Sequence, residues 1–175
     1  MTGYQQAILF LAGSWCGVDF LVRNIDKHYI DAVAGLAPSS RPYKQKNSKP
    51  GKADYWVLKS RALQRPQLSD VNDWCGFCRG FVELQSTLDA PMRRGRCCLR
   101  LRIYGQRDVL TRIMAELPAS PKTIQRVHTQ TGETNAIYYQ SQREIYAIMN
   151  YIDGTPKNPA VWEAWASKMA QADAP

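Results

Sequence analysis

No run of apolar residues in this sequence reaches the roughly 18–20 residues that a membrane-spanning helix needs. The best candidate, residues 7–22, is short, contains Asp19 and has no basic leader, so it indicates neither a membrane span nor a signal peptide. The five cysteines are an odd number and do not suggest a secreted disulfide framework. We therefore predict a soluble intracellular protein of the cytoplasm, an organelle or the nucleoid, which is not secreted and has no membrane partner.

Several catalytic and cofactor-binding patterns are also missing. There is no glycine-rich phosphate loop and no Ser/His/Asp arrangement, and the two histidines are isolated from each other. Cys75 and Cys78 form a CxxC pair with Cys97 and Cys98 downstream, which allows a zinc site. Neighbouring strand residues point to opposite faces, so Cys97 and Cys98 would not both face one ion. We favour core cysteines over a zinc or redox role.

Acidic residues are scarce where basic residues gather. The 175 residues include 23 Lys and Arg against 15 Asp and Glu, which gives a net charge of +8, and 45% of the residues are hydrophobic. This length and composition suit one domain, or two small repeats, with a real core. Residues 41–65 hold eight cations and one acid, and residues 93–112 hold seven arginines and one acid. Two such patches indicate a repeat and a polyanionic partner.

Hydrophobic periodicity and turn residues predict a pattern that occurs twice. In the first half we expect a helix over 4–18, a strand over 20–25, a helix over 26–36 and a hairpin over 43–60. In the second half we expect a helix over 69–85, a hairpin over 86–104, a helix over 106–117, a hairpin over 122–140 and a helix over 141–152. A terminal helix over 159–170 carries Trp162 and Trp165, which would dock on the core or offer a surface to a protein partner.

The predicted fold is therefore α+β, with two pseudo-symmetric αββαββα-type repeats in one monomeric chain. We place the first repeat at 1–68, the second at 69–153 and a helical extension at 154–175. Gly13 corresponds to Gly80 across 67 residues, whereas Ile30 corresponds to Leu110 across 80. The difference of 13 residues is the size of a strand and a turn, so the first repeat is expected to be shortened in its first hairpin.

Residues 94–104 alternate strictly between two kinds of side chain. One face carries Arg94, Arg96, Cys98, Arg100, Arg102 and Tyr104, and the other carries Cys97, Leu99, Leu101 and Ile103. Steps of roughly 6.6–7 Å along one strand face approximate the phosphate spacing of a nucleic-acid strand. Arginine also binds guanine in the major groove, which admits a β-ribbon. Because few acids balance these arginines, we predict a nucleic-acid-binding strand rather than a merely solvated one.

Other polar residues extend this predicted surface. The second hairpin of the second half contributes Gln125, Arg126, Tyr138 and Gln140, residue types that contact bases or phosphates. The basic patch of the first half contributes Lys44, Lys46, Lys49, Lys52 and Lys59 as contacts to the nucleic-acid backbone. We favour DNA over RNA as the partner.

Two short segments resemble degenerate LAGLIDADG motifs. They are Leu-Ala-Gly at 11–13 and Phe-Cys-Arg-Gly-Phe-Val-Glu at 77–83. The stretch Leu-Arg-Leu-Arg-Ile-Tyr-Gly at 99–105, followed by the predicted helix, hairpin and helix, is similar to the rest of a LAGLIDADG repeat. The resemblance to the LAGLIDADG homing endonuclease family covers residues 4–152. It implies that the motif helices pack side by side at Gly13 and Gly80, and that helix-backed antiparallel sheets form a saddle that grips DNA.

In that family the eighth motif position is an acid that binds a divalent metal and cleaves DNA, one in each repeat. Counted with Gly13 and Gly80 as the third positions, the eighth positions here are Val18 and Gln85, and the nearby acids Asp19 and Glu83 are displaced by one and two residues. One residue turns a helix by about 100°, so a displaced acid need not reach the metal. Valine cannot ligate Mg²⁺, which prefers oxygen. We therefore expect a nucleic-acid-binding protein derived from such an endonuclease, without its cleavage activity and without a certain cofactor.

Two alternatives stay open. The first is an active homing-type endonuclease in which Asp19 and Glu83 bind Mg²⁺ beside Gln85. The second is an RNA-binding or structural component of a larger nucleoprotein assembly.

Overall fold

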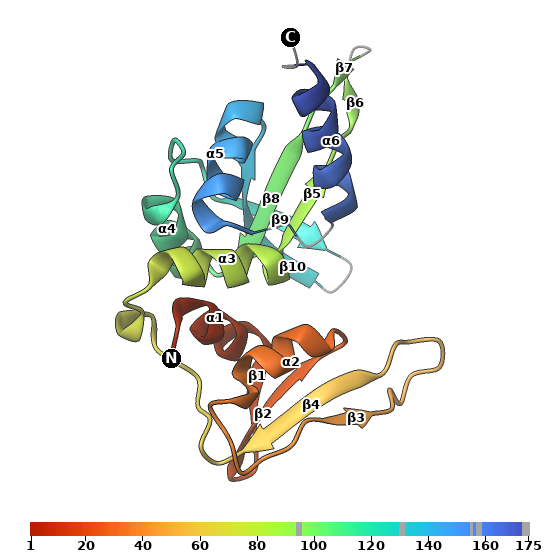
Figure 1. The fold of residues 1–175 in the computed structure, drawn as a ribbon. Coiled ribbons are helices and arrows are strands. Elements are labelled where there is room, and N and C mark those ends of the chain that lie inside the picture. The colour runs from red at the N-terminus through yellow and green to blue at the C-terminus, as the bar shows by residue number, and fades with distance from the viewer. Residues whose placement is uncertain (94–95, 130–131, 155, 157–158, 173–175) are drawn as a thin grey trace. The chain divides into compact units, whose positions relative to one another are not determined.

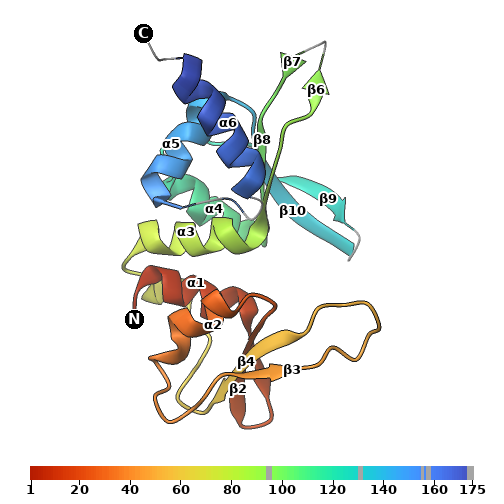
Figure 2. The same cartoon turned by 45° about the vertical axis from the view of Figure 1, so that its right-hand side comes forward.

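The computed structural model describes residues 1–93, 96–129, 132–154, 156 and 159–172. The chain forms two compact units, Met1–Gly80 and Phe81–Pro175, and the division falls inside helix α3 (Trp74–Gln85). Each unit contains a four-stranded antiparallel sheet with helices on one of its faces (Figure 1, Figure 2). The predicted α+β class with two repeats is confirmed.

The first unit begins with α1 (Gly3–Ala12). Thr2 and Gln5 cap the N-terminus of this helix by reciprocal hydrogen bonds. After it come β1 (Gly13–Cys16), β2 (Asp19–Asn24), α2 (Lys27–Ala34), β3 (Tyr43–Gln45), β4 (Tyr55–Ser60) and a short 3₁₀ turn η1 (Leu68–Asp70). The sheet order is β1-β2-β4-β3. Its helix-covered face is apolar and carries the buried residues Phe20, Val22 and Leu58.

The second unit repeats this order after α3. Its elements are β5 (Ser86–Asp89), β6 (Met92–Arg93), β7 (Arg96–Cys97), β8 (Arg100–Gly105), α4 (Arg107–Glu116), β9 (Gln125–Thr129), β10 (Gly132–Tyr139), α5 (Gln142–Ile152) and α6 (Pro159–Ala172). The sheet order is β5-β8-β10-β9, which matches the first sheet strand for strand. Strands β6 and β7 form a small extra hairpin between β5 and β8.

The predicted helix over 4–18 is wrong in its second half. Helix α1 ends at Ala12, and Gly13–Cys16 forms strand β1, which pairs with β2 so that Trp15 lies opposite Phe20. Gly17 has φ +62° and forms the tight turn with Val18, a conformation that glycine adopts without steric cost. The first hairpin is therefore shorter than the second, as predicted, but the strand that the 13-residue difference suggested to be missing is present.

The predicted strand over 94–104 is interrupted. Strand β7 ends at Cys97 and β8 begins at Arg100, although the Cys98 amide still donates to the Pro91 carbonyl at 3.1 Å. The predicted alternation holds across the described part, because Leu99, Leu101 and Ile103 are buried and the arginines between them are not. Arg94 lies outside the described residues, and only the backbone of Arg96 is described.

The terminal helix α6 packs on the second unit. It lies against β5, and the Trp162 and Trp165 rings stack with centroids 5.6 Å apart. Both rings also contact Tyr146 of α5, at 6.0 and 6.5 Å between centroids. The predicted docking on the core is confirmed, and a protein partner for this helix stays a prediction. Among the described residues no helix is long and apolar enough to cross a membrane.

Candidate nucleic-acid interface

The second sheet has one open face, opposite its helices. Residues directly paired across antiparallel strands project to the same side. Arg102 of β8 pairs with Thr87 of β5 and with Tyr138 of β10, and Arg100 pairs with Asp89. These side chains share the face away from buried Leu101 and Ile103. The open face therefore carries a basic and hydroxyl-bearing surface at its centre.

Asp89 joins the two arginines at this centre. Arg100 donates from Nε to Oδ1 of Asp89 at 3.0 Å and from Nη2 to Oδ2 at 2.7 Å. Arg102 donates from Nη2 to the same Oδ2 at 2.7 Å. The Asp89 hydrogen bond raises the pKa of Arg100 above its ordinary value. The arginine side chains are only 24% and 27% exposed, so they are held in place rather than free in solvent.

Asp89 corrects the expectation that acids near these arginines are too few to balance them. It lies outside the arginine-rich segment in sequence, and the pairing of β5 with β8 brings it opposite Arg100. The predicted hairpin over 86–104 already implied that Asp89 and Arg100 lie near each other, because residues near the two ends of a hairpin pair across its strands.

The other predicted residues of this unit fall on different faces. Tyr104 shares a hydroxyl hydrogen bond of 3.3 Å with Thr87, and Gln125 belongs to the open face through its pairing with Ala136. Gln140 is exposed just after β10. Arg126 is on the opposite side, in register with Asn135, and forms an ion pair with Glu133. Arg126 therefore does not join the arginine pair.

The open face of the first sheet carries a second acid between cations. Asp19 of β2 lies 3.1 Å from Lys59 and 3.4 Å from Arg61. The Lys59 hydrogen bond is the main reason why the pKa of Asp19 is lowered. Lys59 is on this face, opposite Leu21, whereas Lys44 pairs with Trp56 on the other face and lies 3.7 Å from Asp54.

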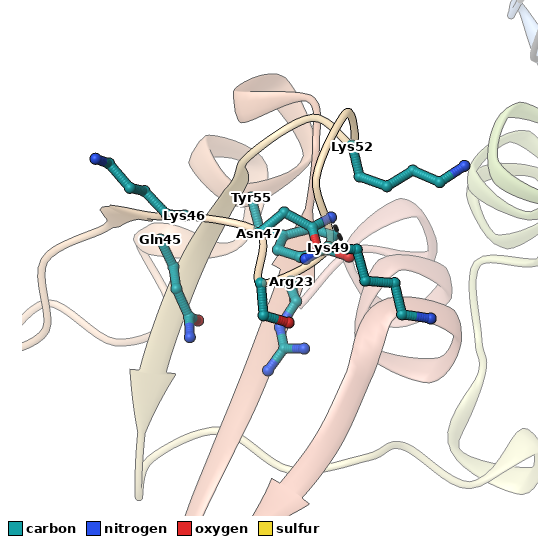
Figure 3. Close-up of a pocket in the computed structure, with 8 residues that line it drawn as sticks. Arg23, Gln45, Lys46, Asn47, Lys49, Lys52 and Tyr55 are labelled. Carbon is teal, nitrogen blue, oxygen red and sulfur yellow. Dashed lines mark hydrogen bonds between the residues drawn. The ribbon is translucent and has the colours of Figure 1, made fainter.

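A basic hollow lies beneath the loop between β3 and β4. Its volume is about 340 Å³, and Figure 3 shows its lining, in which the cations are Arg23, Lys46, Lys49 and Lys52. Asn47 holds the loop in place, because its backbone N–H donates to Oδ1 of Asp54 at 3.2 Å and its side-chain Nδ2 donates to the Tyr55 hydroxyl at 2.9 Å. The Arg23 guanidinium lies 5.4 Å from the Tyr55 ring centroid. Arg23 is not among the predicted binding residues, because its stretch of sequence holds three acids and only one other cation, Lys27.

Glycines bring α1 and the start of α3 together within the first unit. A Cβ placed on Gly80 would lie 2.8 Å from the Ala7 Cβ and 3.1 Å from the Tyr4 carbonyl oxygen. Gly13, the other predicted helix-interface residue, has a different neighbour. It begins β1, and a Cβ there would collide with the Phe20 ring and the Leu9 carbonyl. Its role is therefore to let a strand pass close to the core.

The ends of the motif helices define equivalent positions in the two repeats. Helix α3 ends at Gln85 and α1 ends at Ala12, and each is followed directly by the first strand of its sheet. Ala12, rather than Val18 in the hairpin turn, is therefore the counterpart of Gln85. Asp19 is on a strand and paired with two cations, and Glu83 is buried with 8% of its surface exposed. The ends of the two motif helices do not fit a Mg²⁺ ion, because Ala12 and the neutral amide of Gln85 stand where the resemblance implies acids.

The described cysteines differ in their burial. Cys78 is fully buried, whereas Cys75 and Cys98 are half-buried. In the described part of the chain no group of three or more His, Cys, Asp or Glu side chains could hold a metal ion.

No family model and no curated protein sequence matches the chain. Solved structures do match. The N-terminal LAGLIDADG domain of DUF199/WhiA aligns with a TM-score of 0.56 at 11% identity, over 86% of this chain and 80% of that one. Full-length DUF199/WhiA from Thermatoga maritima aligns with a TM-score of 0.57 at 10% identity. This alignment covers 95% of this chain and 60% of the WhiA chain.

A point mutant of I-SmaMI aligns with a TM-score of 0.66 at 8% identity, over 99% of this chain and 92% of that one. The chain therefore has a LAGLIDADG-like fold, and the resemblance seen in the two short motifs is confirmed at the level of the fold.

Proposed function

We propose that this protein binds nucleic acid, double-stranded DNA in preference to RNA, through the open faces of its sheets, and that it does not cleave what it binds. The observation that carries the proposal is the arginine pair on β8. Arg100 and Arg102 are fixed side by side on an open sheet face, and a β-ribbon fits the major groove of DNA. The LAGLIDADG-like fold shared with WhiA and I-SmaMI supports this assignment.

The basic hollow of the first unit is a second region that we propose contacts nucleic acid. Lys46, Lys49 and Lys52 line it on an exposed loop, where lysines contact phosphates as point charges without reading sequence. Arg23, whose guanidinium lies against Tyr55, adds a fourth cation. We assign phosphate contacts to this group and base contacts to the arginine pair.

The missing acids support binding without cleavage. Metal-assisted phosphodiester hydrolysis needs carboxylates that place metal ions at the attacking and leaving oxygens. The Ala12 side chain has no ligating atom, and the carboxamide of Gln85 is neutral. Asp19 is already paired with Lys59 and Arg61. None of these residues offers a free carboxylate at the end of a motif helix.

A titration of the wild-type chain tests the proposal. Fluorescence anisotropy with labelled duplex DNA, single-stranded DNA and structured RNA should show the tightest binding to the duplex. The logarithm of the association constant should fall with the logarithm of salt concentration with a slope of about −3 to −4, since the four cations assigned to phosphates contribute about 0.9 each. A slope near zero, or tighter binding to RNA than to duplex DNA, would contradict it.

A further inference from the structure

A carboxylate in the middle of the proposed binding surface needs an explanation. Asp89 is on the open face of the second sheet, in contact with the two arginines that carry the proposal. If those arginines served only to hold phosphates, Asp89 would repel the phosphates and cancel one of the two positive charges. Its position therefore points to a task other than phosphate attraction.

We propose that Asp89 is a positioning residue that holds Arg100 and Arg102 in the orientation that reads guanine, which makes it a determinant of DNA sequence specificity. This inference rests on the proposed function. In this proposal the arginine pair recognises the bases, and Asp89 keeps the two arginine side chains rigid.

The donor arrangement of Arg100 supports this role. A guanidinium has five N–H donors in a rigid planar fork. Asp89 takes two of them, one from Nε and one from Nη2, and so fixes the plane of the fork from one edge. The remaining Nη1 and Nη2 donors are parallel and match the O6 and N7 acceptors of guanine in the major groove.

Arg102 is held by a single hydrogen bond from Nη2 to the same carboxylate oxygen. Its Nε is buried and has no hydrogen-bond partner among the described residues, so its terminal nitrogens supply the donors that a ligand can reach. Two arginines two residues apart on one strand face, tied to one anchor, form a pair with little rotamer freedom left to lose on binding.

The first sheet provides an internal comparison. Asp19 also lies between two cations on an open face, but its partners Lys59 and Arg61 are 42% and 77% exposed. Lysine has no planar fork, and the Arg61 contact of 3.4 Å involves Nε and one carboxylate oxygen. Asp19 therefore neutralises charge without orienting a bidentate group. Removing it changes the net charge as much as removing Asp89 does, so Asp19→Asn is the matched control.

The test measures base preference separately from affinity. Binding sites are first selected from a randomised duplex library with the wild-type chain. The Arg100→Ala and Arg102→Ala variants then identify the guanines in these sites that the wild type requires and a variant does not. Each of these guanines is replaced by adenine. In the wild type each replacement should weaken binding about tenfold or more, since a bidentate contact discriminates by roughly 1–3 kcal/mol.

Asp89→Asn should reduce this guanine preference at least about threefold and should leave affinity for unselected duplex equal or higher, because a negative charge is lost. Asp19→Asn should raise affinity for unselected duplex without changing the guanine preference. Asp89→Glu keeps the charge but lengthens the arm, so it should keep wild-type affinity for unselected duplex and lose part of the preference. Thermal unfolding of each variant verifies that it is folded.

Two outcomes would overturn the inference. One is a wild-type guanine preference in both Asp89→Asn and Asp89→Glu, and the other is an equal loss of preference in Asp19→Asn. If duplex DNA binds the wild type and the Arg100 and Arg102 variants weaken that binding, the proposed function survives either outcome. If the wild type does not bind duplex DNA, the proposed function and this inference fail together.

Discussion

Replacing Arg100 and Arg102 together by alanine is expected to weaken binding to duplex DNA about 100-fold at physiological salt. Each bidentate arginine contact to a base is worth roughly 1–3 kcal/mol, and every 1.4 kcal/mol is about tenfold in affinity. Asp89 adds to the loss, since it would lose its contacts with both of these cations and its negative charge would repel the duplex. Fluorescence anisotropy on a selected duplex measures the change.

The matched control removes two arginines from the opposite side of the same unit. Arg107 of α4 and Arg143 of α5 are exposed on helices that cover the other face of the sheet (Figure 2). Replacing both by alanine changes the net charge equally and should weaken binding less than about threefold, because only long-range attraction is lost. Equal losses in the two double variants would show that bulk charge, rather than the open face, determines binding.

Gly80→Val is expected to destabilise the protein by about 3 kcal/mol. A Cβ at this position already lies 2.8 Å from the Ala7 Cβ, and valine adds two further methyl groups in a buried site. Overpacking of a close contact typically costs about 1–3 kcal/mol or occasionally more, and the gain in helix propensity over glycine is smaller than that cost. Equilibrium unfolding in urea, followed by circular dichroism, measures the difference.

Two further variants separate the helix contact from a general effect of valine. Ala7→Gly removes the Cβ that Gly80→Val would meet, so the double variant should recover part of the lost stability, with the Tyr4 carbonyl contact remaining. A Cβ on Gly35 would have no neighbouring atom within 4 Å, and φ there is −62°, so Gly35→Val should change stability by less than about 1 kcal/mol. Similar losses at Gly80 and Gly35 would refute the close helix contact.

Sequence reasoning reached the repeat and the face of β8 because both rest on strong periodicities. Leu99, Leu101 and Ile103 alternate with polar residues, and strand geometry then decides which side chains are buried. The hairpin over 43–60 followed from its turn at Lys49–Lys52, where Gly51 has φ +74°.

The parts that could not be predicted depend on contacts distant in sequence. The end of α1 at Ala12 is decided by the pairing of Trp15 with Phe20, which local helix propensity does not register. The face on which Lys44 falls depends on its register with Trp56, and a shift by one residue would reverse it. The bond between Asp89 and Arg102 likewise requires the register of β5 against β8.

We propose above that this LAGLIDADG-like chain holds duplex DNA and leaves it intact. The most direct test incubates the wild type with its selected duplex and Mg²⁺ or Mn²⁺, and follows the bound fraction and strand breaks in the same sample. We expect a saturable bound fraction and full-length strands throughout. Metal-dependent breaks at a fixed site that Asp19→Asn or Glu83→Gln abolishes would contradict it.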